Sequence, residues 1–311
     1  MDFKDFTAAR DDSDRRLNKV VLRIFEAEKV QNNIFPLIRK GLIKVNGKKT
    51  SAEYKVQEND VIQVAAFLLH KDETSATENE SKAKKVFPFS LEQITVFRNE
   101  HILIVNKPAG VNVQPAKDCP FCLCDLIEED FNGKKGTSIS FRPGPLHRID
   151  RWTSGLVAFS QSSEGAKWFT ENIKNHSIKK QYMGITQGDY KNTEEKYVDL
   201  IYAPESSSTK YGTVVCGGTD GKNAITYARF IKKTEIQGIK CNVVSFDIET
   251  GRKHQIRAQS AFHAHPLLGD TAYGGTKLNG KMFFLHAFKL TFPANPLGLP
   301  EEIMADCPFL Q

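Results

Sequence analysis

The densest group of chemically capable side chains lies at residues 147–151, which read His-Arg-Ile-Asp-Arg. The Ser-Gly pair at 154–155 predicts a turn, and the apolar run 156–159 predicts a buried strand directly after it. Polar side chains beside a buried strand need hydrogen-bonding partners. Asp150 is therefore either a reactive carboxylate or one half of an ion pair.

A second polar segment offers cations that such a carboxylate can use. Residues 250–257 read Thr-Gly-Arg-Lys-His-Gln-Ile-Arg and include Arg252, His254 and Arg257. A neighbouring arginine stabilises an ionised carboxylate, and an ionised, oriented carboxylate can act as a nucleophile or a base. A purely structural ion pair fits the same residues, and spacing alone favours that interpretation.

Two further segments complete a pattern that favours chemistry instead. Residues 106–110 read Asn-Lys-Pro-Ala-Gly directly after the apolar run 102–105, and residues 179–182 read Lys-Lys-Gln-Tyr. In their chain order, the four segments resemble the RluA-type family of pseudouridine synthases. The resemblance extends over residues 88–311, and its central signature is the run from His147 to Leu156. It implies an isomerase that converts specific uridines in RNA to pseudouridine.

The resemblance also implies roles for individual residues. Asp150 matches the family's nucleophilic aspartate, Arg257 the arginine that pairs with it, and Tyr182 the tyrosine placed against the target base. Whether the aspartate acts first at the ribose or on the uracil ring stays open. Three more residues are expected to bind the substrate: Arg148, which matches the arginine that enters the RNA stack where the base leaves, Lys180 and Arg252.

No cofactor or metal is expected, because the isomerisation neither adds nor removes any atom. Cys119, Cys122 and Cys124 form a cluster, but a structural zinc normally takes four ligands and no second pair of suitable spacing follows. We therefore expect a short apolar loop there. The histidines are expected to be hydrogen-bonded structural groups, namely His147, His254, His263, His265 and His286.

The chain is predicted to contain two domains joined by a linker. Residues 71–85 include no Leu, Ile, Val or aromatic residue, so they cannot bury enough apolar surface to offset the entropy of ordering. A flexible linker is expected over 71–87. It separates a small domain at 13–70 from a catalytic domain at 88–311.

The small domain is predicted to be α+β. Ser13 or Asp14 is expected to cap a first helix and Asn33 a second, and Asn46-Gly47 predicts a tight hairpin. The segments at 16–17, 37–41, 45–47 and 59–62 together resemble the S-four RNA-binding module of ribosomal proteins and tyrosyl-tRNA synthetases. That resemblance implies contacts to RNA phosphates by a group of basic residues, Arg39, Lys40, Lys44 and Lys48.

The larger segment is also predicted to be α+β, with a mixed, mainly antiparallel sheet of pseudouridine synthase type. It combines strand-like runs at 102–105, 156–159 and 243–248 with a helix-like run at 163–174, and it has no regular βαβ alternation. The run 243–248 alternates as a strand with one buried face does.

Charge and hydropathy fit a protein that acts on RNA. The formal net charge is +6, no apolar run has the length of a membrane span, and the first five residues are polar. We expect a cytoplasmic monomer with no membrane contact, acting on large-subunit ribosomal RNA.

The alternatives are a transfer RNA pseudouridine synthase and a non-catalytic RNA-binding or ribosome-assembly factor. An aspartate-dependent hydrolase would call for a second acid or a metal, and neither is evident.

Overall fold

The described residues fall into two compact units. The computed structural model describes residues 1–69, 87–116, 119, 121–132, 138–204, 212–280 and 283–310. The first unit contains residues 1–69 together with 127–132, 138–143 and 162–164, and the second contains all the others. The first unit therefore extends beyond the predicted range 13–70. The predicted linker at 71–87 lies, apart from Phe87, outside the described residues.

The first unit packs two helices against a three-stranded antiparallel sheet with strand order β1-β3-β2. One face of α1 is buried at helical spacing and forms much of the core. The elements are β1 (Phe3–Thr7), η1 (Arg10–Asp12), α1 (Leu17–Ala27), α2 (Ile34–Lys40), β2 (Ile43–Val45), β3 (Val61–Ala65) and η2 (Ala66–Leu68).

Local sequence signals succeed at α2 and fail at α1. The side chain of Asn33 accepts a hydrogen bond from the Phe35 amide, so this predicted cap is confirmed. The predicted caps of α1 are wrong, because the helix begins after Arg16 without a side-chain cap. Asp14 instead has a φ of 64° and pairs with Lys55 at 2.7 Å.

The predicted hairpin at Asn46-Gly47 is confirmed as a turn but not as a strand pair. Both residues have positive φ, 51° and 77°, and a single bridge joins Val45 to Lys48. Strand β2 pairs along its length with β3, from a more distant part of the chain. That pairing buries Ile43 and Val45 in the core, which a local hairpin would not achieve.

The buried carboxylate of Asp12 holds two distant stretches of the first unit together. It accepts hydrogen bonds from the hydroxyls of Ser138 and Ser140 and from the amides of Ile139 and Ala9. Burial alone would raise the pKa of Asp12, but these hydrogen bonds outweigh it and lower the pKa. No local sequence pattern predicts this link.

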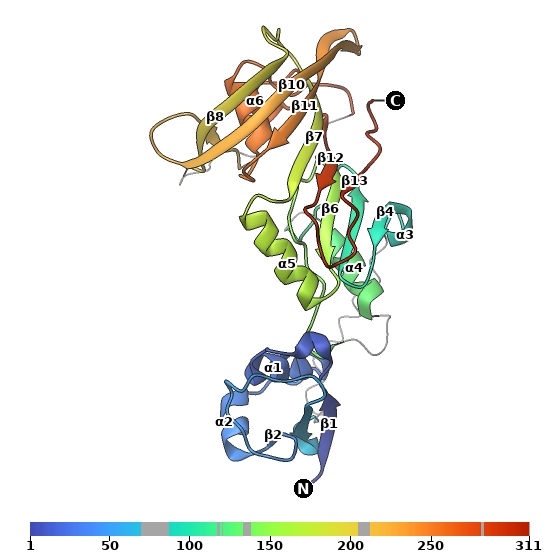
Figure 1. The fold of residues 1–311 in the computed structure, drawn as a ribbon, viewed down its shortest axis with the longest axis vertical. Coiled ribbons are helices and arrows are strands. Elements are labelled where there is room, and N and C mark those ends of the chain that lie inside the picture. Colours follow the sequence, from blue (N-terminus) through green and yellow to red (C-terminus); the bar gives the residue numbers. More distant parts are fainter. Residues whose placement is uncertain are drawn as a thin grey trace. The chain divides into compact units, whose positions relative to one another are not determined.

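The second unit is built on one large, mainly antiparallel sheet, as predicted (Figure 1). Among the pairs of its described strands, β6 with β12 is parallel and the others are antiparallel. The strand order is β4 (Thr95–Arg98), β5 (Ile102–Lys107), β6 (Ser154–Ser160), β12 (Leu285–Thr291), β7 (Lys179–Thr186), β11 (Ile239–Ile248), β10 (Lys222–Ile236), β8 (Glu194–Tyr202) and β9 (Val215–Cys216), with β13 (Glu302–Met304) beside β12.

The predicted strands at 102–105 and 156–159 and the predicted helix at 163–174 are confirmed. The strand at 243–248 exists, but the prediction of one buried face is wrong, because residues 241–246 are buried without interruption. None of the helices formed by the described residues is long and apolar enough to cross a membrane. The remaining helices are α3 (Leu91–Ile94), α4 (Leu123–Asn132), α5 (Ser163–Lys174), α6 (Gln255–Phe262) and η3 (Thr271–Tyr273).

Candidate active site

A buried lysine holds the loop that carries Asp150 in place. Lys107, the last residue of β5, is fully buried, and its ammonium donates to the carbonyls of Pro108, Val111 and Arg151 at 2.9–3.0 Å. Gly110 adds a second clamp, since its amide donates to the Arg151 carbonyl at 2.8 Å. The Asn-Lys-Pro-Ala-Gly segment thus holds the residue next to Asp150. Burial lowers the pKa of Lys107 to about 7.

The other end of this loop is held by close contact between strands. Gly155 enters β6 with a φ of 106°, and a Cβ atom on it would overlap the backbone of Ala287 in β12. Only glycine fits such an approach. Because β12 lies between β6 and β7, the Asp150 loop is placed close to the strand that carries Tyr182.

Helix α6 supplies the cation that holds Asp150. Arg257 donates through Nη1 to Oδ2 of Asp150 at 3.2 Å. Its Nε and Nη2 donate to the two carboxylate oxygens of Asp270 at 2.7 and 2.9 Å. The side chain of Asp270 is 2% exposed and that of Asp150 is 27% exposed. Asp270 therefore serves to orient the arginine, while Asp150 is the carboxylate open to a substrate.

Arg257 stays charged in this setting. Burial opposes its charge, but the hydrogen bonds and charge of Asp270, followed by those of Asp150, raise the pKa of Arg257 above its ordinary value. The guanidinium also lies 4.4 Å from the ring centre of Phe283 and 5.0 Å from that of Tyr273. These aromatic faces stabilise a cation that has lost most of its water.

His254 lines the same site, although the sequence predicted a structural role for it. It precedes α6 with a left-handed φ of 52°, and its Nε2 lies 3.8 Å from Oδ1 of Asp150. Its Nδ1 lies 2.9 Å from the Tyr273 hydroxyl, which also accepts the amide hydrogen of Val214. Burial lowers the pKa of His254 to about 4, so the ring is neutral at physiological pH.

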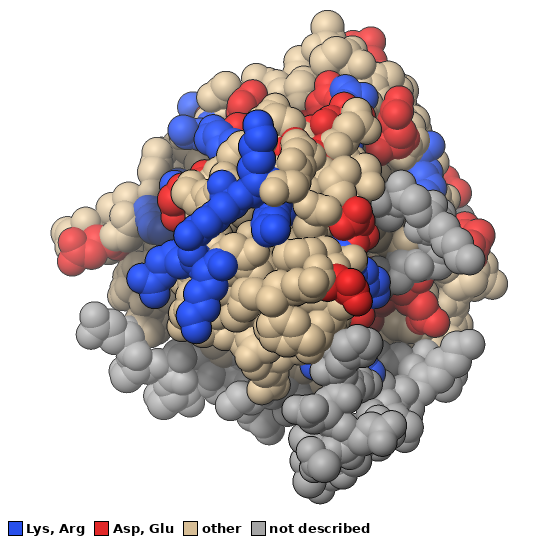
Figure 2. Space-filling model, turned by 90° about the horizontal axis from the view of Figure 1, so that it is seen from below, with Lys and Arg blue, Asp and Glu red and all other residues tan. Residues whose placement is uncertain are grey.

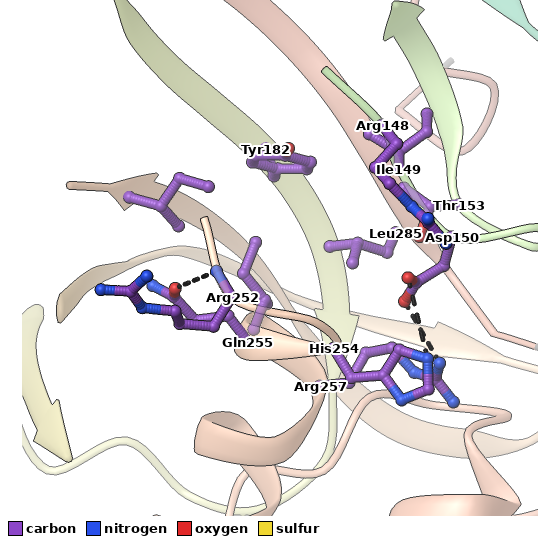
Figure 3. A pocket seen from close by; sticks show the side chains of 12 residues that line it. Arg148, Ile149, Asp150, Thr153, Tyr182, Arg252, His254, Gln255, Arg257 and Leu285 are labelled. Atoms are coloured by element: carbon purple, nitrogen blue, oxygen red, sulfur yellow. Dashed lines mark hydrogen bonds and ion pairs between the residues drawn. The ribbon is translucent and has the colours of Figure 1, made fainter. Parts of the chain in front are cut away.

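Asp150, His254 and Arg257 line a hollow in the second unit, and Tyr182 lines it as well. Tyr182 lies on β7 between Phe246 of β11 and Ala287 of β12, and only 8% of its surface is exposed. Its ring and the Asp150 carboxylate line the same hollow (Figure 3). Burial raises the pKa of the Tyr182 hydroxyl, so it remains protonated at physiological pH.

The remaining predicted residues of the second unit lie at different distances from this hollow. Arg148 is exposed and lines it together with Arg252, whose Nε donates to the Asn223 carbonyl at 2.9 Å. Lys180 is not among the lining residues; its ammonium lies beside Gly251. Burial lowers the pKa of Lys180. The basic residues predicted in the small domain belong to the first unit.

Sequence reasoning missed Asp270, Tyr273 and Phe283 as parts of the site. Asp270 and Tyr273 lie in a segment that the resemblance had already included, so their position was the available signal. Phe283 carried no signal, because an isolated aromatic residue is usually part of a core.

The cysteine cluster shows ordinary contacts. The Cys122 thiol lies 3.3 Å from a carboxylate oxygen of Asp125, and the Cys119 thiol lies 2.9 Å from the Phe121 carbonyl. Within the part of the chain that the structure describes, no three His, Cys, Asp or Glu side chains are grouped as metal ligands.

Comparison with known proteins identifies the family of this chain. Residues 101–262 match the model of a protein family described as RNA pseudouridylate synthase. The chain belongs to this family. It is therefore an RNA pseudouridine synthase, an isomerase, as the four sequence segments predicted. The matched region includes Asp150, Tyr182 and Arg257.

Relatives of this RNA pseudouridine synthase extend over most of its length. "Ribosomal large subunit pseudouridine synthase C" of Vibrio vulnificus is 26% identical, and the match covers 88% of this chain and 83% of the relative. "Uncharacterized RNA pseudouridine synthase YlyB" of Bacillus subtilis is 27% identical, with 98% and 94% covered. "Ribosomal large subunit pseudouridine synthase D" of Zymomonas mobilis is 34% identical over 58% of this chain and 56% of its own.

Solved structures share the fold of this pseudouridine synthase. The human RNA pseudouridylate synthase domain containing 1 superposes with a TM-score of 0.59 at 23% identity, covering 72% of this chain and 87% of that one. The human RNA pseudouridylate synthase domain containing 4 superposes with a TM-score of 0.56 at 19% identity, covering 71% of this chain and 90% of that one.

Proposed function

We propose that this enzyme converts specific uridines of large-subunit ribosomal RNA to pseudouridine, with Asp150 as the nucleophile. One observation carries the proposal: a partly exposed carboxylate, oriented by the buried Arg257, lines a hollow shared with Tyr182. The choice of RNA is supported by the relatives from Vibrio vulnificus and Zymomonas mobilis, which are named for the large ribosomal subunit.

The reaction needs little beyond these groups. The bond from the ribose C1′ to the uracil N1 breaks, a bond from C1′ to C5 forms, and the proton on C5 is lost while N1 gains one. Arg257 fixes Oδ2 of Asp150, which leaves Oδ1 facing the hollow with His254 at 3.8 Å. Tyr182 presents its ring to the uracil.

A uridine within a stacked helix cannot reach Asp150 unless it is flipped out, at a cost of a few kcal/mol. Arg148 is suited to lower this cost because it is exposed at the rim of the hollow, two residues from the nucleophile. Its side chain would fill the gap left in the RNA stack. Lys180 and Arg252 are proposed to add positive charge beside the RNA backbone.

Tritium release from RNA labelled at uridine C5 tests the proposed nucleophile. Wild type should release tritium, and Asp150→Asn should lose at least about a thousandfold in rate, as expected when a covalent catalyst is removed. Asp189→Asn is a suitable control, since it makes the same change at an exposed carboxylate away from the hollow. Equal rates for wild type and Asp150→Asn would disprove the role of Asp150.

The first unit is proposed to be an S-four-like RNA-binding module that increases affinity for the substrate. Lys and Arg side chains gather in a stripe on one molecular face (Figure 2). Among the predicted contacts, Arg39, Lys40 and Lys48 are exposed, and no described carboxylate lies within ion-pair distance of them. Lys44 is partly buried, and its ammonium lies 4.6 Å from the ring centre of Phe3.

Salt dependence of RNA binding tests this module. Replacing both Arg39 and Lys40 by Ala should reduce the slope of log affinity against log salt by about 1.4 to 1.8, since each phosphate contact contributes about 0.7–0.9. The control removes two exposed lysines, Lys232 and Lys233, from β10 of the second unit. An unchanged slope for the Arg39/Lys40 variant would contradict the role of these residues.

Two rival functions make different predictions in a deletion strain. A transfer RNA enzyme would leave ribosomal pseudouridines intact when the gene is removed. A non-catalytic assembly factor would be replaced fully by the Asp150→Asn protein. We propose instead that specific pseudouridines of large-subunit ribosomal RNA disappear. We also propose that the enzyme acts as a cytoplasmic monomer, which light scattering of the purified protein and fractionation of cells can check.

A further inference from the structure

A second hollow lies next to the active site in the second unit. Its walls are the end of β8, the residues before β9, the start of β10 and the turn before α6. Its volume is about 570 Å³. Arg252 lines both this hollow and the one that contains Asp150. A chain that runs from the active site past Arg252 would reach the second hollow.

The lining combines positive charge with flat apolar surface. Lys222, Arg252 and Lys253 contribute three cations, and the described residues that line it include no carboxylate. None of the three lies within ion-pair distance of a carboxylate among the described residues. The apolar part comes from Tyr202 and Ala203 at the end of β8, beside the buried side chains of Ile201 and Val214. Such a surface favours a ligand that is anionic and also has an apolar face.

An aromatic ring lines this hollow. Tyr202 is the last residue of β8 and is 39% exposed, although large aromatic side chains are usually covered. Two wall positions are glycines, Gly221 and Gly251. Gly221 has a φ of 141°, and a Cβ there would come within 2.9 Å of the Ile201 carbonyl oxygen. Only glycine therefore fits at position 221 in this wall.

We infer that this hollow is a binding site for a nucleotide that flanks the target uridine, with its base stacked on Tyr202 and its phosphates beside Lys222, Arg252 and Lys253. The inference rests on the proposed function, because the occupant is part of the same RNA substrate. A base offers a flat apolar face and a phosphate offers the negative charge, so one nucleotide satisfies both kinds of surface. Continuity through Arg252 places it beside the flipped uridine.

The two hollows are also joined by a hydrogen bond. Val214, which lines the second hollow, donates its amide hydrogen to Tyr273, and the same hydroxyl lies 2.9 Å from Nδ1 of His254. His254 in turn faces Asp150. The wall of the second hollow is therefore connected through Tyr273 to His254 beside the nucleophile.

Steady-state tritium release from a transcript of large-subunit ribosomal RNA tests the inference. Tyr202→Ala should raise KM about tenfold and leave kcat within twofold of wild type, because stacking contributes equally before and during the reaction. Tyr202→Phe keeps the ring and should retain the wild-type KM. Lys222→Gln should raise KM about threefold, whereas Lys233→Gln, on the exposed far part of the same strand, should not.

A short RNA hairpin that contains one target uridine can locate the occupant. Abasic nucleotides are placed in turn at each position beside the target. At one position the missing base should raise the wild-type KM about tenfold, and Tyr202→Ala should show no further increase there. The inference is overturned if Tyr202→Ala leaves KM unchanged, if Tyr202→Phe is as poor as Tyr202→Ala, or if no flanking base matters. Absence of tritium release by wild type would instead refute the proposed function.

Discussion

Replacing the buried Lys107 by Met should change how the stability of this enzyme depends on pH. The ammonium of Lys107 is enclosed by the carbonyls of Pro108, Val111 and Arg151 and is fully buried. Methionine has a similar length and volume but cannot be protonated. It removes one titrating group from the folded and unfolded chains while keeping most of the packing.

The sign and size of the effect follow from the lowered pKa of Lys107. Its ordinary value of 10.5 applies to the unfolded chain, and burial lowers the folded value to about 7. Between these values the unfolded chain binds more protons, so the free energy of unfolding rises with pH. Each pH unit adds about 1.4 kcal/mol at most, which gives a rise of about 2.5 kcal/mol from about pH 7.5 to about pH 9.5. This stabilisation is lost as the pH falls through about 7.

Urea unfolding of wild type and Lys107→Met at both pH values measures this effect. Other titrating groups are present in both proteins, so their contributions cancel in the difference. The variant should be less stable at either pH, because the carbonyls around Lys107 lose their side-chain donor. The gap between the two proteins should be about 2.5 kcal/mol wider at the higher pH. A gap that is the same at both values would refute the reasoning.

Three further predictions concern other contacts. Gly155→Ala should lower the free energy of unfolding by about 3 kcal/mol, since the added Cβ would overlap Ala287. The control Gly144→Ala, whose Cβ would have no neighbour within 4 Å, should change it by less than about 0.5 kcal/mol, and thermal unfolding of both variants measures the difference. Asp12→Asn should cost about 3 kcal/mol and speed hydrogen exchange at the Ile139 amide, which donates to that carboxylate. Tyr273→Phe should lower kcat about tenfold and leave KM within twofold of wild type, because His254 loses the hydroxyl beside its Nδ1. A change in KM as large as the change in kcat would contradict this.

The elements around the site could be predicted because their signals are local. A capping asparagine at 33, the apolar spacing of 163–174 and the buried run before Lys107 each specify structure within a few residues. The pairing of Asp150 with Arg257 was also foreseen, but only through the family resemblance. The residues alone favoured a structural ion pair, and the difference is the 27% exposure of Asp150, which spacing does not encode.

What could not be predicted depends on contacts between distant segments. Asp12 meets Ser138 and Ser140 across more than a hundred residues, and no periodicity marks either side. His254 was assigned a structural role because a lone histidine usually has one. Its proximity to Asp150 follows from the left-handed turn before α6, a backbone state that histidine adopts only infrequently.

The Asp12 contact has a consequence for how such enzymes can be inherited. The first unit is assembled from three separate stretches of chain, with 127–143 and 162–164 lying far beyond its N-terminal part. A recombination event that moved residues 1–86 alone would leave Asp12 without its serine donors and the serines without their acceptor. This unit is therefore not encoded by one continuous stretch of sequence, and its sequence is expected to descend together with that of the catalytic unit, between whose segments its other pieces lie.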